Sequence, residues 1–468
     1  MNENRPLASC PPPALIEALQ GVVGERVTLN RSIREHHSHD ESWHDGALPD
    51  AVCFPESTEE VARIAKLCCE HRIPMIPFGT GTGVAGSVNA VGGGMTIDLS
   101  RMDRLLSVYA DDFSCRVQAG LTYKRLNEQL RDTGLFFSVD PGADASVGGL
   151  AATRASGTNT VKYGSMRENV LSLTAVLADG RIVKTGSRAR KSAAGYDLTQ
   201  LFIGSEGTLG IITELIVRLH GRPAASASAS VQFPDLKSAV DAVIATLQHN
   251  IPMARIELVD EMLLQAINRF SGTRFEPAPS LFVEFQGSDS SVREDAEMFG
   301  EICGEFGCKG FRWTANEQEA RAMWEARHSA AYAFLALRPG AKNFSTDVCV
   351  PVSRLAECIE QTRADAEKNV DVIYAIAGHV GDGNFHTAFL VDPTIEEERK
   401  QVEAFYDRLV ARALSMEGTC SGEHGIGMQK LKYMAEEFSA ESLDVMRAIK
   451  SALDPQWLMN PGKKILRS

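Results

Sequence analysis

The stretch PFGTGTGVAG, residues 77–86, decides the fold class, because Gly81 to Gly86 match the G-x-G-x-x-G pattern of a Rossmann nucleotide-binding unit. In that unit a helix follows at once, and its N-terminus meets the pyrophosphate. Here the next residues, SVNAVGGGMTIDLS (87–100), are glycine-rich and then alternate like a half-buried strand. Glycines let backbone N–H groups approach an anion closely. The sequence therefore predicts a phosphate-cradling loop outside a Rossmann unit, with a plain structural turn as the alternative.

Two more glycine-rich stretches follow this loop along the chain. They are DPGADASVGGLAATRASGTNTVKYG (140–164) and GSEGTLGIIT (204–213). One such loop is a weak signal. Three of them in order indicate backbone that wraps an extended ligand.

The composition is that of an ordinary globular protein. The 468 residues are 44% hydrophobic and 23% charged, and the length suits two or more domains. A formal net charge of −13 argues against a nucleic-acid partner, and no apolar run approaches the ~20 residues of a membrane span. The first residues, MNENRPLASCPPP, lack a secretory signal pattern, and the ten cysteines include no CxxC pair. We therefore expect a cytoplasmic protein with reduced thiols, and leave peripheral contact with a membrane open.

The segment GRPAASASAS (221–230) indicates a domain boundary, because it is small, polar and interrupted early by proline. Before it, helices and strands mix, with a helix capped by Ser57 and a hairpin signal at Asp179-Gly180. After it, helical and strand patterns alternate again. We expect an antiparallel sheet there with helices on one face.

Two histidines flank a turn in AGHVGDGNFH (377–386). Strand-like runs lie on both sides, and Asp382-Gly383 suits a two-residue type I′ turn, which would set His379 directly opposite His386. Directly opposed side chains share a face with Cβ atoms ~4.5–5.5 Å apart, which suits two imidazoles on one metal ion. A stacked surface pair without metal is the alternative.

The stretch CSGEHGIG (420–427) supplies what the histidine pair lacks. Glu423 would be a hard, anionic third ligand, and two histidines with a glutamate form a catalytic ligand set that suits zinc, manganese or iron about equally. His424 would then be left for acid–base chemistry. The histidine-rich HHSHD (36–40) is a competing metal site, but its polar surroundings favour a solvated loop.

The order of these motifs resembles the flavin domain of the vanillyl-alcohol oxidase and p-cresol methylhydroxylase superfamily. The resemblance runs from about residue 50 to NPGK (460–463). Within the superfamily the chain is similar to the FAD-dependent D-lactate dehydrogenases of the cytochrome-linked type. The similar phrases are IPFGTGTG, DPGADAS, RKSAAGY, STDVCVP, GHVGDGNFH and GEHGIG.

The resemblance implies a two-domain α+β flavoprotein. Residues 1–222 would form an FAD-binding domain of the p-cresol methylhydroxylase type with an N-terminal extension. Residues 223–424 would form a substrate or cap domain that carries the metal site on an antiparallel sheet covered by helices. Residues 425–468 would be a helical segment that returns to the FAD domain.

The resemblance also implies FAD contacts in all three glycine-rich stretches. The pyrophosphate cradle would be Gly79, Thr80, Gly81, Thr82 and Gly83. The flavin would be lined by Pro141, Gly142, Ser146, Gly149, Ser156 and Asn159. The adenosine end would be held by Glu206, Gly207, Gly210 and Ile212, and Pro77, Tyr163 and Asn460 complete the set. The first loop has neither histidine nor cysteine, so we expect non-covalent FAD.

In the family that the chain resembles, a His, His, Glu metal site lies beside the flavin, with the following histidine as base. His379, His386 and Glu423 match the ligands and His424 matches the base. Arg327 and Lys342 match the positions that bind the substrate carboxylate.

We therefore expect FAD- and metal-dependent oxidation of a small D-2-hydroxy acid, foremost D-lactate to pyruvate. Glycolate or D-2-hydroxyglutarate are alternative substrates for the same chemistry. A flavin-free zinc hydrolase and a non-enzymatic FAD-binding subunit are alternatives of other classes. The sequence has no haem or cluster motif, so electrons would pass to an external acceptor such as cytochrome c, a quinone or an electron-transfer flavoprotein.

Overall fold

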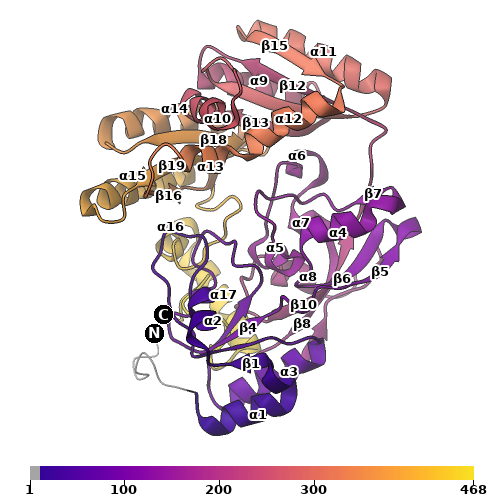
Figure 1. The fold of residues 1–468 in the computed structure, drawn as a ribbon, viewed down its shortest axis with the longest axis vertical. Coiled ribbons are helices and arrows are strands. Elements are labelled where there is room, and N and C mark those ends of the chain that lie inside the picture. Colours follow the sequence, from indigo (N-terminus) through magenta and orange to yellow (C-terminus); the bar gives the residue numbers. More distant parts are fainter. Residues whose placement is uncertain (1–10, 468) are drawn as a thin grey trace. The chain divides into compact units, whose positions relative to one another are not determined.

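The computed structural model describes residues 11–467, and the chain in it divides into two units (Figure 1). Of the described residues, unit 1 holds 11–156, 164–222 and 423–467, and unit 2 holds 157–163 and 223–422. The sequence placed boundaries after residues 222 and 424. The observed divisions fall after 222 and 422, and the short segment 157–163 packs in unit 2.

Unit 1 is built on two sheets. The first has the order β1-β2-β4-β3, in which β2, β4 and β3 run parallel. The second is antiparallel with the order β5-β6-β10-β8-β9. The strands are β1 (Val27–Thr28), β2 (Ala51–Cys53), β3 (Met75–Phe78), β4 (Met95–Asp98), β5 (Leu105–Tyr109), β6 (Ser114–Gln118), β8 (Val170–Val176), β9 (Ile182–Lys184) and β10 (Ile211–Arg218), with the short pair β7 (Leu135–Phe136) and β11 (His220–Gly221).

The helices of unit 1 follow local signals in the sequence. Ser57 caps α3, as expected, by accepting a hydrogen bond from the Glu60 N–H, and Thr122 caps α4 in the same way through the Arg125 N–H. The helices are α1 (Pro13–Val23), α2 (Arg31–His36), α3 (Thr58–Glu70), α4 (Tyr123–Leu130), α5 (Val147–Thr153), α7 (Met166–Asn169), α8 (Leu198–Phe202), α16 (Met434–Glu437) and α17 (Ala440–Leu453).

Unit 2 is an antiparallel sheet with the order β15-β12-β14-β13-β18-β19-β16, and β17 pairs with β19 beside β16. The strands are β12 (Ala225–Gln232), β13 (Met253–Val259), β14 (Ser280–Gly287), β15 (Lys309–Thr314), β16 (Lys342–Ser345), β17 (Val348–Cys349), β18 (Tyr374–His379) and β19 (Asn384–Val391). The helices are α6 (Thr160–Tyr163), α9 (Leu236–Gln248), α10 (Glu261–Ser271), α11 (Asp289–Glu305), α12 (Glu317–His328), α13 (Ala330–Leu335), α14 (Val352–Asn369) and α15 (Glu396–Ser415).

Helices cover both faces of this sheet, so the expectation of helices on one face is wrong. Residues of α10, α12 and α13 form an apolar cluster with Val259, Phe282 and Ala375 on one face. On the other face α11 and α15 pack aromatic rings against the strands, as in the Phe285–Phe299 and Phe389–Phe405 contacts. The strand positions alternate between these two apolar layers, because neighbouring residues of a strand point to opposite faces.

The serine–alanine run that looked like a boundary segment is β12, a strand inside the sheet between β14 and β15. Its alternation explains this. Ala227 and Ala229 lie on one face of the sheet, and Ser228 and Ser230 on the other, and all four are buried. The small side chains leave room for the helices on both sides.

Candidate functional site

The first glycine loop leaves β3 and reaches β4 without a helix, so the Rossmann interpretation is excluded as expected. Gly79 approaches Ser146 so closely that a Cβ atom would lie 2.5 Å from its Oγ, and Gly81 has a φ of +72°, which favours glycine. Within residues 11–467, no backbone carbonyl accepts a hydrogen bond from the N–H groups of residues 79–83. These N–H groups suit an anion, and the loop therefore fits the pyrophosphate of FAD.

The HHSHD segment supports this loop, and it is solvated only in part: His36 and His39 are exposed as expected, whereas His37 and Asp40 are buried. Its Asp40 is buried and accepts hydrogen bonds from the N–H groups of Ser42 and Ser87, and the following Glu41 donates from its N–H to the Gly83 carbonyl. The segment therefore fixes the C-terminal part of the glycine loop, at Gly83 and Ser87. The sequence missed this role because the pairing partners lie more than 40 residues away.

His37 of the same segment is buried and makes two hydrogen bonds. Its Nδ1 lies 2.7 Å from the Ile33 carbonyl oxygen, and its Nε2 lies 2.7 Å from a carboxylate oxygen of Asp98. Burial alone would lower its pKa, but the hydrogen bonds to Asp98 and Ile33 outweigh it and raise the pKa of His37. Both ring nitrogens of His37 thus bind protein groups, so neither is left to coordinate a metal.

The remaining residues expected to contact FAD lie in loops and at element ends of unit 1, with two exceptions. Ser146 caps α5 by accepting from the Gly149 N–H. Asn159 and Tyr163 belong to unit 2, where Asn159 accepts from Arg255 and Tyr163 donates to Gln286. The expected contacts that lie in unit 1 loops, in β3 or at the start of β10 are Pro77, Pro141, Gly142, Ser156, Gly207, Gly210, Ile212 and Asn460.

Glu206 anchors the loop of the GEHGIG motif. Its buried carboxylate accepts hydrogen bonds from the N–H groups of Ile426 at 2.8 Å and Gly427 at 2.6 Å. Lys464 adds an ion pair at 3.4 Å, and Asn460 donates to the Glu206 carbonyl. Both oxygens of the carboxylate thus bind protein groups. This carboxylate is engaged with the chain segment that directly follows Glu423 and His424.

The two histidines of the hairpin share one face of the sheet, but they are not directly opposed. His379 pairs with Asn384, and His386 pairs with Ala377, so the turn has four residues, Val380 to Gly383, in place of the expected two. The histidines are therefore diagonal neighbours, which remain within reach of each other. Their ring centroids are 5.8 Å apart, and the rings are nearly perpendicular.

Hydrogen bonds select the tautomer of each histidine. The Nδ1 of His379 lies 2.6 Å from Oε1 of Glu257, and the Nδ1 of His386 lies 2.9 Å from the Thr346 carbonyl. Both acceptors hold a proton on Nδ1, so the lone pair of each neutral ring lies on Nε2. A metal-binding histidine commonly donates its other N–H to a carboxylate or a carbonyl. Ligand nitrogens of the two rings lie within 4.8 Å of each other, a spacing that one ion can bridge.

The two residues that precede Glu423 in the chain contact the strands that carry this hairpin. Ser421 donates to a carboxylate oxygen of Asp347 at 3.1 Å. Gly422 packs so tightly on Asn384 that a Cβ atom would lie 2.1 Å from the amide nitrogen. Asn384 is the residue paired with His379, and Glu423 is one peptide further along the chain. Two imidazoles with a carboxylate fit a divalent metal.

Glu257 joins the metal-ligand candidate His379 to Arg327. It lies on β13, and its side chain is 1% exposed. Its Oε1 faces His379, and its Oε2 accepts from Nη2 of Arg327 on α12 at 2.7 Å. The buried Nε of Arg327 has no hydrogen-bond partner within residues 11–467. A buried guanidinium N–H without an acceptor fits a carboxylate ligand.

The structure does not bring Lys342 to this group, so its expected role is corrected. Lys342 is the exposed first residue of β16, and it pairs with Val391 at the end of β19 far from the turn. Five residues separate Val391 from His386, or ~17 Å along a strand. The alternation of β19 also turns Val391, and with it Lys342, to the face opposite His386.

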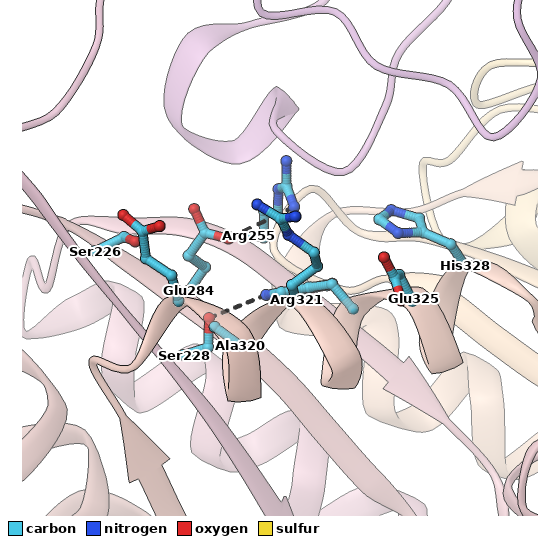
Figure 2. Close-up of a pocket in the computed structure, with 10 residues that line it drawn as sticks. Ser226, Ser228, Arg255, Glu284, Ala320, Arg321, Glu325 and His328 are labelled. Carbon is cyan, nitrogen blue, oxygen red and sulfur yellow. Dashed lines mark hydrogen bonds and ion pairs between the residues drawn. The ribbon is translucent and has the colours of Figure 1, made fainter. Parts of the chain in front are cut away.

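A pocket of about 360 Å³ lies on the histidine face of the sheet, between the strands and α12 (Figure 2). Arg255 faces Glu284 there at 3.5 Å, and Trp324 donates to Ser228. His328 also lines the pocket, and although it is exposed at the rim, partial desolvation together with the nearby Arg255 and Arg327 lowers its pKa to about 4. His328 is therefore neutral at physiological pH. The sequence did not point to this pocket.

Comparison with known families agrees with this geometry. Residues 49–186 match the model of an FAD binding domain, and residues 222–464 match the model of the C-terminal domain of FAD linked oxidases. The crystal structure of p-cresol methylhydroxylase with bound substrate has the same fold, with a TM-score of 0.77 over 97% of this chain and 96% of that chain, at 16% identity.

Two curated relatives are similar over nearly the whole chain. The "Probable D-lactate dehydrogenase, mitochondrial" of Danio rerio is 49% identical, over 96% of this chain and 91% of its own length. The "D-lactate dehydrogenase [cytochrome], mitochondrial" of Arabidopsis thaliana is 42% identical, over 97% of this chain and 80% of its own length. Both names contradict the expected cytoplasmic location, which is therefore wrong. Within residues 11–467, no helix has the length and apolar character to cross a membrane.

Proposed function

Because the chain belongs to the family of FAD-linked oxidases, we propose that it is an FAD- and metal-dependent dehydrogenase that oxidises D-lactate to pyruvate. The observation that carries the proposal is the hairpin, where His379 and His386 hold their protons on Nδ1 and share one face. Arg327 lies next to this pair, joined through Glu257. Two candidate metal ligands and a cation that suits a carboxylate thus lie on the same face of the sheet, the cation supplied by α12.

FAD would be held without a covalent bond in unit 1. The N–H groups of residues 79–83 would bind the pyrophosphate, and the remaining contacts expected from the sequence would come from the second and third glycine stretches and Asn460. When bound, FAD would accept the Cα hydride of the substrate at its N5 atom.

The metal would be held by His379, His386 and Glu423. When bound, zinc, manganese or iron would act as a Lewis acid that makes the 2-hydroxyl of the substrate easier to deprotonate. A ligand set of two imidazoles and one carboxylate leaves coordination positions open for such a substrate.

The protein side chains would bind the acid and remove its proton. Arg327 would pair with the substrate carboxylate through its buried N–H, which fixes the molecule so that one hydrogen is presented for transfer. A ring nitrogen of His424 would take the proton of the 2-hydroxyl. Loss of that proton and of the Cα hydride turns the alcohol into the keto group of pyruvate.

The two electrons would leave to an external acceptor. The name of the Arabidopsis relative includes a cytochrome, and we extend that acceptor to this chain. Both relatives are named as mitochondrial enzymes, and we propose the same compartment.

The test is anaerobic titration of the purified protein with D-lactate, L-lactate, glycolate and D-2-hydroxyglutarate, followed through bleaching of the flavin absorption near ~450 nm. We expect D-lactate to bleach the flavin at the lowest concentration and L-lactate to leave it yellow. Acid precipitation of the same sample should release FAD into the supernatant. Faster bleaching by glycolate or D-2-hydroxyglutarate would reassign the substrate, and a colourless protein would leave the hydrolase alternative.

A further inference from the structure

We propose that Glu257 is a positioning residue that sets the metal ligand His379 and the carboxylate-binding Arg327 in one arrangement. The inference rests on the proposed function and assigns to the site a residue that touches neither metal nor substrate. Within the described residues of unit 2, Glu257 is the carboxylate that binds both side chains at once.

The burial of Glu257 makes this contact specific. The residue lies on β13 next to β18, and its side chain is 1% exposed while those of His379 and Arg327 are 18% and 14% exposed. The two partners come from different elements, since His379 ends β18 and Arg327 lies in the last turn of α12. A buried carboxylate has to be paired and hydrogen-bonded, so both partners are held against it.

The contact with His379 determines which nitrogen can bind a metal. Because Oε1 of Glu257 accepts at Nδ1, the proton stays on Nδ1 and the ring can donate its lone pair from Nε2. The negative charge also makes the imidazole a stronger donor, as in other carboxylate–histidine–metal arrangements. The Nδ1 of His386 instead bonds directly to a neutral carbonyl, that of Thr346, and the nearest carboxylate, that of Asp347, lies 3.8 Å away. His379 is therefore the histidine whose Nδ1 is hydrogen-bonded directly to a carboxylate.

The contact with Arg327 determines where its remaining donors point. Oε2 of Glu257 takes the Nη2 end of the guanidinium, and the planar group then has its buried Nε N–H without a protein acceptor. A substrate carboxylate bound there would lie next to the side chain that also orients the metal ligand. One carboxylate thus links the position of the acid group to the position of the metal.

The chain offers a matched control in Glu284. Glu284 lies on β14 and is 9% exposed. It forms an ion pair with Arg255 at 3.5 Å on the face of the sheet that also carries Glu257 (Figure 2). Glu284→Gln therefore removes one carboxylate charge from the same face without touching His379 or Arg327. This variant shows how far the loss of one carboxylate charge from this face changes metal affinity and KM when the contacts of His379 and Arg327 stay intact.

The experiment measures the affinity of the flavin-loaded protein for Mn²⁺ and Zn²⁺ by equilibrium dialysis and elemental analysis, and the KM for D-lactate. Glu257→Gln should bind both metals about 10- to 100-fold more weakly, the usual effect of losing such a partner of a metal ligand, and should raise KM. Glu284→Gln should keep the wild-type metal affinity. Arg327→Gln should raise KM and keep the metal affinity, since Glu257 still holds His379.

The double variant Glu257→Gln with Arg327→Gln covers the case in which Glu257→Gln leaves an unpaired arginine and does not fold. It removes both charges together, and it should keep its flavin and show the same loss of metal affinity. Wild-type metal affinity in a folded Glu257→Gln or in the double variant would overturn the inference and leave the proposed function intact. A wild-type protein that binds neither metal would overturn both.

Discussion

Arg327 illustrates how a single side chain can have two tasks. Its Nη2 pairs with the buried Glu257, which neutralises the charge, while its Nε has no acceptor in the described structure. A guanidinium presents five N–H donors, so one ion pair does not exhaust it. Lys342 matched the same family pattern in the sequence but lies on the opposite face of the sheet. The two cations therefore form a natural comparison.

Replacing Arg327 by alanine should raise the KM for D-lactate about ten- to a hundredfold, because the loss of a charge-assisted contact costs roughly 1.5–3 kcal/mol. Lys342→Ala should leave KM and kcat at the wild-type values, since its side chain is exposed and remote from the hairpin. Steady-state kinetics on both purified variants checks this. Equal effects of the two substitutions would contradict the separation of their roles.

Local sequence patterns reveal functional side chains that stand in unusual stretches, such as a glycine-rich turn. They miss functional side chains that stand in a regular strand. His379 and His386 stand among glycines around a turn, so their shared face was predictable even though the turn is longer than expected. Glu257 lies in MARIELV, where it has the period of an ordinary strand. Its importance depends on partners from α12 and β18, 70 and 122 residues away, and no local pattern contains them.

At the scale of elements, the loop after Glu423 and His424 depends on Glu206. The sequence assigned Glu206 to the adenosine end of FAD, yet both of its oxygens accept from the backbone of residues 426 and 427. Gly425 packs on the same carboxylate, with a Cβ position 2.9 Å from Oε1 and a φ of +81°. The segment that supplies the proposed third ligand and the base is thus fixed by its backbone.

Glu206→Gln should therefore lower kcat while the protein keeps its flavin. The amide has one acceptor where the carboxylate has two, so one of the two N–H groups loses its partner and the loop shifts. Misplacement of a reacting group by about 1 Å costs on the order of a hundredfold in rate. Flavin content from the absorption spectrum and kcat per bound flavin separate the two roles. Loss of flavin with unchanged kcat per bound flavin would support the adenosine contact instead.

The sequence predicts elements well where caps and periodicity agree, and less well where composition misleads. The helix capped by Ser57 and the strands on both sides of AGHVGDGNFH are present within a residue or two of the expectation. The run ASASASVQ has no large apolar residue before its valine, yet it forms an inner strand. Its alanines and serines are selected by helices that pack on both faces of the sheet, which is a tertiary requirement.

At the scale of the whole molecule, most of the proposed FAD contacts lie in unit 1, and the two histidines proposed as metal ligands lie in unit 2. The glycine loop that fits the FAD pyrophosphate lies in unit 1, with its support from Asp40. The proposed metal ligands His379 and His386 lie in unit 2 with Glu257 and Arg327. The proposed third ligand Glu423 and the proposed base His424 lie in unit 1. Each unit has its own apolar core, since one cluster is built from unit 1 residues and the other from unit 2 residues. Changes to the two histidines of unit 2 should therefore leave FAD in place.

His379→Ala and His386→Ala test this division, because each removes one imidazole from the metal site and nothing from the FAD loop. Both variants should lose the bound metal and most of their turnover, while their flavin absorption and FAD content stay at the wild-type level. Elemental analysis, visible spectra and steady-state assays on the same preparations measure the bound metal, the flavin and the turnover.

His37→Ala is the matched control in unit 1, since this histidine is hydrogen-bonded to Asp98 at the end of β4. It should keep the metal and, if it has any effect, weaken FAD retention. Turnover that survives in either metal-site variant would falsify the metal dependence, and loss of flavin from them would show that the units do not act separately.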